Sequence, residues 1–169
     1  MAIVRARASC LCDGIDQTQL RAAALAARLV AGDVVCLCGQ LGAGKTYFTK
    51  GLVRGLGGDA DDVTSPTFVL MQVYEARLTV SHFDAYRLTS SAQMLDIGSD
   101  ETFAGDGVRV VEWADRVPEA LPDERYEVRL AVRGPTQRFL EITGRGRRQA
   151  DAVAFLVSQG LFQPTDPVL

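Results

Sequence analysis

Asparagine is missing from this sequence of 169 residues. A regulatory GTPase specifies guanine with an Asn-Lys-x-Asp motif, which a chain without asparagine cannot contain. The Asp-x-x-Gly motif, a second signature of those proteins, is also absent. The sequence therefore argues against a regulatory GTPase.

Long apolar runs are missing as well. No run reaches the roughly 18 residues that a membrane-spanning helix needs, and the N-terminus lacks the apolar core of a signal peptide. We therefore expect a cytoplasmic protein that makes no contact with a membrane.

The four cysteines form two Cys-x-Cys pairs, Cys10/Cys12 and Cys36/Cys38. Structural zinc sites usually separate paired cysteines by two or more residues, which these pairs do not. The second pair also lies in an apolar run, where small side chains suit a buried strand. We expect buried, unpaired thiols rather than a metal site or a disulfide.

Lysine is scarce, since Lys45 and Lys50 are the only lysines among 18 basic residues. The net charge of −3 gives no general attraction to polyanions, so we expect no DNA binding, and contact with RNA only locally or through partner proteins. The length and the 47% of hydrophobic residues fit one globular domain, spanning residues 1–169.

One stretch carries a phosphate-binding pattern. The apolar run Val34–Cys38 is followed by Gly39-Gln-Leu-Gly-Ala-Gly-Lys45-Thr46 and then by a helical pattern. This order of strand, glycine-rich turn and helix is the context in which the Gly-x-x-x-x-Gly-Lys-Thr motif binds a nucleotide triphosphate. Backbone N–H groups and the helix N-terminus would face the phosphates. Lys45 would reach the β- and γ-phosphates, and the Thr46 hydroxyl is a hard oxygen ligand for Mg²⁺.

Two carboxylates follow apolar strands. Glu112 comes directly after Val108–Val111, and Asp84 comes after Leu78–Phe83. Ligands of open α/β sheets gather outside the carboxyl ends of the strands, where the phosphate-binding loop also lies. Either acid could hold Mg²⁺ or its waters, or position an attacking water.

Four other features are less specific. The turn Ser65-Pro66-Thr67 could present hydroxyls toward phosphate or metal, or be an ordinary loop. His82, the only histidine, shares a strand face with Asp84, and a space-filling role with local hydrogen bonds is favoured over a metal or proton-shuttle role. Trp113, the only tryptophan, fits either the core or the nucleotide site. Arg145, Arg147 and Arg148 are most simply a solvated basic turn.

The remaining pattern predicts an α/β protein, a single P-loop NTPase-like domain with a mixed central sheet, flanking helices and two β-hairpins. We expect strands at Ile3–Ala8, Val34–Cys38 and Val108–Val111. The predicted hairpins are Phe68–Tyr74 with Leu78–Phe83, and Tyr126–Val132 with Arg138–Ile142. The predicted helices are a first one capped by Asp16 and stopped by Gly32, then Lys45–Leu56, Ser90–Ile97 and Ala150–Leu156, before a frayed tail at Gln163–Leu169.

Four motifs together resemble the TsaE (YjeE) family: Gly39–Thr46, Ser65-Pro66-Thr67-Phe68, His82-Phe-Asp-Ala-Tyr-Arg-Leu88 and Val111-Glu-Trp113. Their order and spacing match from the first helix to about Trp113. The last third of the chain matches only in its hairpin-like layout.

The resemblance implies an ATPase that works with TsaD and TsaB in the threonylcarbamoylation of the adenosine next to the anticodon of tRNA. It implies contact with tRNA only through that complex, slow intrinsic hydrolysis that the partners stimulate, and ATP and Mg²⁺ as cofactors. Mg²⁺ would be held through Thr46 and Glu112, and Asp84, Glu112 and Lys45 would serve catalysis. The expected nucleotide-binding residues are Gly39, Leu41, Gly42, Ala43, Gly44, Lys45, Thr46, Tyr47, Thr67 and Trp113.

Tyr47 departs from the family, which often has a second threonine there. The backbone N–H remains, so we expect nucleotide binding to persist. The start of the first helix, near Gln17, is a candidate for contact with adenine. Two alternatives stay open: a small-molecule kinase, which should carry an arginine-bearing lid, and a nucleotide-gated interaction module with negligible turnover.

Overall fold

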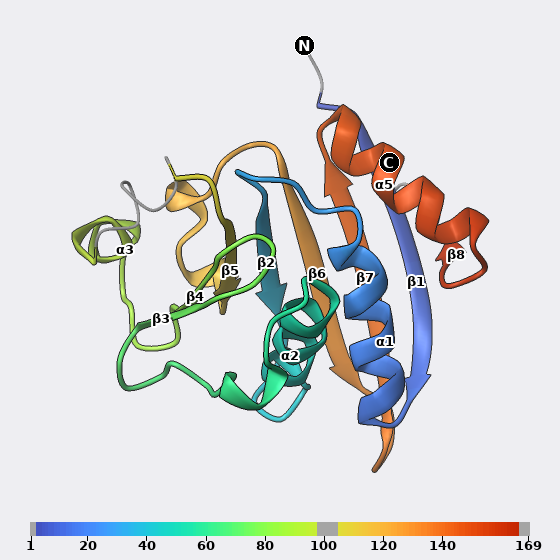
Figure 1. The fold of residues 1–169 in the computed structure, drawn as a ribbon, viewed down its shortest axis with the longest axis horizontal. Helices are drawn as coiled ribbons and strands as arrows, with labels where there is room; N and C mark the ends of the chain where they lie inside the picture. The colour runs from blue at the N-terminus through green and yellow to red at the C-terminus, as the bar shows by residue number, and fades with distance from the viewer. Residues whose placement is uncertain (1–2, 98–104, 166–169) are drawn as a thin grey trace.

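The computed structural model describes residues 3–97 and 105–165. Within these residues, eight strands form one sheet in the order β3-β4-β5-β2-β6-β7-β1-β8 (Figure 1). The strands are β1 (Arg5–Asp13), β2 (Val34–Cys38), β3 (Met71–Tyr74), β4 (Val80–Asp84), β5 (Val108–Glu112), β6 (Arg125–Val132), β7 (Gln137–Arg145) and β8 (Gln163–Pro164). The helices are α1 (Ile15–Ala26), α2 (Lys45–Gly55), α3 (Ser91–Asp96) and α5 (Arg147–Ser158), with 3₁₀ turns at Ala60–Asp62, Ala114–Arg116 and Pro118–Ala120.

The sheet is mixed. Strands β4, β5, β2 and β6 are parallel to one another, whereas β3 and the strands from β7 outward pair antiparallel. The central strands β4 and β5 are buried along their whole length, because both faces of this part of the sheet are covered. The predicted mixed sheet and both hairpins, β3–β4 and β6–β7, are confirmed.

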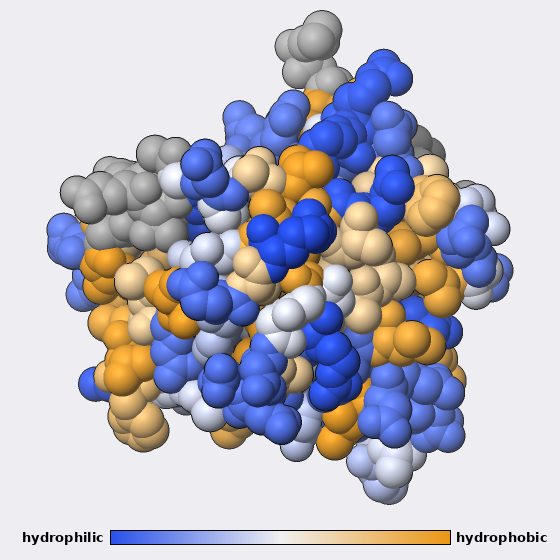
Figure 2. Space-filling view, in the orientation of Figure 1, coloured by the Kyte–Doolittle hydropathy of each residue, from blue (hydrophilic) through white to orange (hydrophobic). Residues whose placement is uncertain are grey.

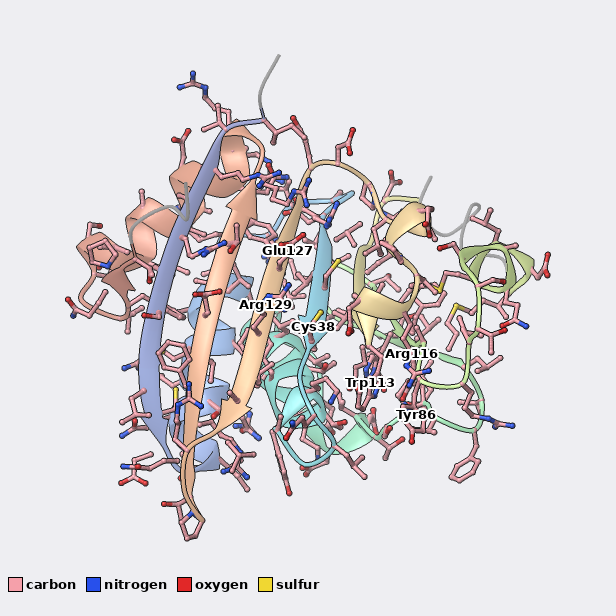
Figure 3. All side chains as sticks on the ribbon, turned by 180° about the vertical axis from the view of Figure 1, so that it is seen from behind. Cys38, Tyr86, Trp113, Arg116, Glu127 and Arg129 are labelled. Atoms are coloured by element: carbon pink, nitrogen blue, oxygen red, sulfur yellow. The ribbon has the colours of Figure 1, made fainter. Side chains whose placement is uncertain are left out.

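Two apolar clusters cover the faces of the sheet. The larger cluster joins α1, α2 and α5 to the sheet through residues such as Leu25, Leu52, Val128 and Leu156. Figure 1 shows these helices in front of the strands, and Figure 3 shows the strands from behind, with the helices on the far side. The smaller cluster, which includes Phe83, lies under α3 and the 3₁₀ turns at Ala114–Arg116 and Pro118–Ala120.

The start of α1 differs from the prediction. Asp16 does not cap the helix: Gly14 is the N-cap, with φ of 88°, and no side chain bonds the first turn. The reason lies in β1, which pairs residue by residue with β7 as far as Asp13 and leaves Gly14 alone to turn the chain. β1 is accordingly longer than the predicted strand Ile3–Ala8.

The end of α1 also differs, because the helix stops at Ala26, well before Gly32. The Leu29 side chain turns into the core, and the buried Asp33 carboxylate accepts the Val30 N–H at 2.8 Å. These contacts provide a tight link to β2 that a longer helix would exclude.

The predicted frayed tail is only partly testable. Gln163 and Pro164 pair with β1 as β8, so frayed structure is wrong for this part. Residues 166–169 lie outside the described residues. Among the described residues, no helix has the length and apolarity that a membrane span requires.

Helices α1 and α2 cross closely at two glycines of α2. A Cβ atom on Gly51 would lie 2.4 Å from the Gln19 carbonyl oxygen and 2.7 Å from the Ala22 Cβ. A Cβ atom on Gly55 would lie 2.7 Å from the Ala26 Cβ. The crossing therefore requires small residues in the second half of α2.

We expect Gly51→Ala to destabilise the protein by about 1–3 kcal/mol, because the added methyl group overpacks this crossing. Helix propensity alone would make the alanine variant more stable by up to about 1 kcal/mol. The sign of the change in unfolding free energy therefore shows whether the close crossing or helix propensity dominates. Urea unfolding measures the effect. Gly134→Ala is the control, since its Cβ would approach nothing closer than 3.7 Å, and equal behaviour of the two variants would contradict the close crossing.

Candidate nucleotide site

The loop between β2 and α2 has the geometry of a phosphate cradle. Gly42 and Gly44 adopt φ of 79° and 104°, which favours glycine, and Gly44 is the N-cap of α2. A Cβ atom on Gly39 would lie 2.6 Å from the Leu130 carbonyl oxygen, so glycine is required there by the neighbouring strand. The loop therefore turns tightly directly before a helix N-terminus that no side chain caps, which suits an anion.

Lys45 is the buried cation of this loop. Its Nζ donates to the carbonyl oxygens of Gly39 at 2.7 Å and Gln40 at 3.0 Å, and it lies 4.0 Å from the centre of the Trp113 ring. Burial lowers the pKa of the ammonium below its ordinary value, against the opposite effect of Glu112 and Asp84. The ammonium is thus bound by weak partners that a phosphate could replace.

The two predicted acids lie next to each other. Asp84 and Glu112 are register partners at the ends of the parallel strands β4 and β5, and both are 2% exposed. Glu112 Oε1 accepts a hydrogen bond from the Thr46 hydroxyl at 3.1 Å. Because β4, β5 and β2 are parallel, their carboxyl ends lie at the same end of the sheet. Both carboxylates therefore lie where α2 begins, as expected for ligand-binding residues of such sheets.

The Ser65–Thr67 turn holds Asp84. Asp84 Oδ2 accepts hydrogen bonds from the Thr67 hydroxyl at 2.8 Å and from the Ser65 hydroxyl at 3.4 Å, while Oδ1 accepts the Tyr86 N–H at 2.8 Å. The turn is therefore more than an ordinary loop, because it fixes one of the two acids.

His82 lies behind Glu112 and is fully buried. Its Nε2 is 2.9 Å from Glu112 Oε1, and because a carboxylate only accepts, Nε2 carries the proton. Its Nδ1 is 3.1 Å from the Tyr74 hydroxyl. Burial raises the pKa of Tyr74 to about 12, so the hydroxyl stays protonated at neutral pH. The favoured role of His82, filling space with local hydrogen bonds, fits these contacts, and one of the partners is Glu112 on the neighbouring strand.

Trp113 stands at the edge of the site, where Figure 3 labels it beside Tyr86 and Arg116. Its backbone is left-handed, with φ of 57°. The ring packs against Tyr86 with centroids 4.9 Å apart, and the Arg116 guanidinium lies 5.1 Å from the centre of the Tyr86 ring. Directly after Glu112, this backbone places the indole over Lys45, while the residue also packs against the smaller apolar cluster.

These residues surround one cavity of about 490 Å³. The residues singled out in the sequence that line it are Leu41, Gly42, Gly44, Lys45, Thr46, Tyr47, Ser65, Thr67, Asp84, Glu112 and Trp113. Gly39 and Ala43 do not line it, because they pack against the Leu130 backbone and in the core.

The start of α1, the candidate segment for contact with adenine, contributes Gly14, Ile15 and Thr18 to the wall, whereas Gln17 itself accepts the Asp13 N–H at 2.9 Å. The rest of the wall comes from Tyr86, Pro135, Thr136 and Arg138, which were not predicted as site residues. No motif marks these positions, and only the pairing of β1 with β7 brings the two turns together.

The cluster Arg145–Arg148 is not simply solvated. Arg145 donates to Glu127 at 3.0 Å, and Arg148 pairs with the buried Asp33. Two of the three arginines thus hold β6, β7 and the start of α5 in place, and they lie outside the residues that line the cavity.

The donor atoms fit Mg²⁺ only together with a nucleotide. Thr46, Glu112 and Asp84 offer hard oxygens, as Mg²⁺ prefers. Among residues 3–97 and 105–165, however, no group of three or more histidine, cysteine or acidic side chains could hold a metal ion alone. This is the pattern of sites where phosphate oxygens and waters supply most of the ligands.

The sequence is similar to a protein-family model and to proteins of other organisms. Residues 12–140 match the family model "Threonylcarbamoyl adenosine biosynthesis protein TsaE". The chain is 48% identical over 112 residues to a protein of Treponema pallidum, covering 66% of this chain and 81% of that one. It is 41% identical over 134 residues to a protein of Bacillus subtilis, covering 79% and 83%. Both relatives are named tRNA threonylcarbamoyladenosine biosynthesis protein TsaE.

A solved structure agrees with the fold. The crystal structure of Bacillus subtilis YdiB superposes with a TM-score of 0.76 at 32% identity, covering 95% of this chain and 99% of that one. The predicted P-loop NTPase-like fold is thereby confirmed.

We expect Lys45→Met to abolish measurable binding of nucleotide triphosphates while changing the free energy of unfolding by less than about 1 kcal/mol. The lost hydrogen bonds and the removed cost of burying a charge act in opposite directions. Because the folded-state pKa of Lys45 is lowered, the wild type should gain stability relative to the variant as the pH rises toward 10.5, the ordinary value. Calorimetry and urea unfolding across that pH range test both statements, and a large loss of stability at neutral pH would contradict the assignment.

Proposed function

The chain belongs to the TsaE family, and we propose that it binds ATP with Mg²⁺ in the cavity beside α2 and hydrolyses it to support threonylcarbamoylation of the adenosine next to the anticodon of tRNA. The observation that carries this proposal is that Lys45, Thr46, Asp84 and Glu112 all line one cavity. These four side chains are the cation, the hydroxyl and the acids that phosphoryl transfer to water requires.

Each residue has a role in this proposal. Lys45 exchanges the Gly39 and Gln40 carbonyls for the β- and γ-phosphates. Thr46 and Glu112, which already share a hydrogen bond, hold Mg²⁺ directly or through water. When bound, Mg²⁺ neutralises charge on the β- and γ-phosphates.

Asp84 is best placed to orient the attacking water. Its carboxylate is held by the Ser65–Thr67 turn, whereas Glu112 is bound to the Thr46 hydroxyl, so Asp84 is the acid that is not engaged with the proposed Mg²⁺-binding hydroxyl. The rest of the cavity, between the start of α1 and Pro135 and Thr136, would receive the nucleoside.

TsaD and TsaB are the proposed partners, and tRNA would be reached only through them. Support comes from large apolar side chains exposed close to the cavity: Leu41 is 84% exposed in the phosphate loop, and Phe68 is 87% exposed directly after Thr67. Figure 2 shows apolar surface over the region where Figure 1 places β3 and the loop before it. Exposed apolar groups of this size are typical of protein interfaces.

A nucleotide-gated interaction module is the second candidate. The contacts of Lys45 favour this candidate. If Lys45 exchanged its loop carbonyls for a phosphate, the conformation of the loop and the position of Trp113 would change together. The two candidates differ in turnover. Release of phosphate from ATP, measured with TsaD and TsaB present and absent, separates them, and addition of small-molecule acceptors tests the kinase alternative.

We expect Glu112→Gln to lower partner-stimulated phosphate release by at least about 10²-fold, since Mg²⁺ and the transferred phosphoryl group lose a charged ligand. Nucleotide binding measured by calorimetry should be largely retained through the loop. Asp151→Asn is the matched control, because Asp151 is an exposed acid on α5. Unchanged release in Glu112→Gln would remove this residue from the mechanism.

We expect Phe68→Asp to weaken the ATP-dependent pull-down of TsaD and TsaB by about 10-fold or more, as for an apolar interface residue. ATP binding by the free protein should stay unchanged, because Phe68 does not line the cavity. Val132→Asp, a similar change at an exposed valine at the end of β6, serves as the control. Equal retention of the partners by both variants would place the interface elsewhere.

A further inference from the structure

We infer that His82 is a positioning residue for Glu112: it holds the carboxylate in the orientation that Mg²⁺ and ATP require, and Tyr74 in turn holds His82. The inference rests on the proposed function, because it assumes that Glu112 binds Mg²⁺. His82 itself is fully buried and does not line the cavity.

Two hydrogen-bond donors hold the Glu112 carboxylate. Oε1 accepts from the Thr46 hydroxyl at 3.1 Å and from His82 Nε2 at 2.9 Å. In the proposed complex the Thr46 oxygen would ligate Mg²⁺ through a lone pair, and its O–H group could still donate to Glu112. His82 is the donor that lies outside the cavity wall, so it would hold the carboxylate whether or not Mg²⁺ is bound.

The His82 imidazole is itself held by a neighbour on β3. His82 is 0% exposed in the middle of β4, and its Nδ1 lies 3.1 Å from the Tyr74 hydroxyl on β3. That hydroxyl is also 2.6 Å from Gln72 Oε1 and 3.2 Å from the Thr64 carbonyl oxygen. Partners of this kind behind a metal ligand fix its orientation, and their loss typically costs metal affinity.

The segment that supports Asp84 lies close to Tyr74. Thr64 precedes the turn whose Ser65 and Thr67 hydroxyls hold Asp84. Because Nε2 carries the imidazole proton, Nδ1 accepts, and the single proton of the Tyr74 hydroxyl is donated to it. The Thr64 carbonyl oxygen lies 3.2 Å from the same hydroxyl, so Tyr74 also lies against the segment that precedes the Asp84 turn. Strand β3, which has no residue in the cavity wall, would thus support Glu112 through His82.

The test uses two substitutions that differ in the position of one N–H group. In His82→Gln the amide nitrogen can reach the place of Nε2 and donate to Glu112. In His82→Asn the amide reaches only the place of Nδ1, so Glu112 loses its donor, although the change in polarity is similar. Binding of a non-hydrolysable ATP analogue to the full chain is measured by calorimetry at increasing Mg²⁺, and again in EDTA.

We expect His82→Asn to raise the Mg²⁺ concentration at half-saturation by about 10–100-fold, the usual effect of losing such a partner. His82→Gln should restore most of the wild-type value, and Tyr74→Phe should shift it in the same direction as His82→Asn by a smaller factor. Binding in EDTA should be equal in all four proteins, because the phosphate loop is unchanged.

A wild-type Mg²⁺ midpoint in His82→Asn, or equal shifts in the asparagine and glutamine variants, would reduce His82 to a residue that fills space. If neither His82 variant folds, Tyr74→Phe decides, and an unshifted midpoint there overturns the inference. Failure of the wild type to bind the analogue at any Mg²⁺ concentration would instead overturn the proposed function itself.

Discussion

A buried ammonium group is the constraint around which this site is built. Taking a charge out of water is costly, and the chain offsets the cost at Lys45 with two loop carbonyls, the face of Trp113 and two nearby acids. None of these partners forms a close ion pair with Nζ among the described residues. The site is therefore held together in the free protein, yet it keeps a cation whose best partner, a phosphate, would come from outside.

The sheet makes this arrangement possible. Parallel pairing of β2 with β5 and of β5 with β4 brings Glu112 and Asp84 to the edge from which α2 starts. The close crossing of α1 and α2 then closes the other side of the cavity, with Gly14, Ile15 and Thr18 as its wall. Polar support comes from outside the parallel strands, through Tyr74 on β3 and the Ser65–Thr67 turn. Residues of several elements therefore converge at this end of the sheet, and no single motif builds the site.

Much of this could be predicted from the sequence where the signal was local. The phosphate loop, both hairpins and the two acids follow from short patterns and from the rule for strand ends. The contacts that could not be predicted depend on strand order. His82 meets Glu112 because β4 lies beside β5, and Arg148 meets Asp33, 115 residues away in the chain. The Asp16 cap failed because pairing of β1 with β7 determines where the chain can turn, which overrides a local capping signal.

Charge at the cavity explains why slow intrinsic turnover follows from the proposed function. A transferred phosphoryl group needs cations around its oxygens, and P-loop enzymes often gain a further arginine from a partner. Among the described residues that line the cavity, the cations are Lys45 and Arg138. Arg138 is engaged with the Gly42 carbonyl at 3.2 Å, and Arg116 rests on aromatic rings beside the site. Lys45, which faces two acids, would by itself leave the transition state of a bound triphosphate poorly neutralised. On the proposed function, a protein partner that adds positive charge, or that moves Arg116 from its rings, would therefore turn binding into hydrolysis.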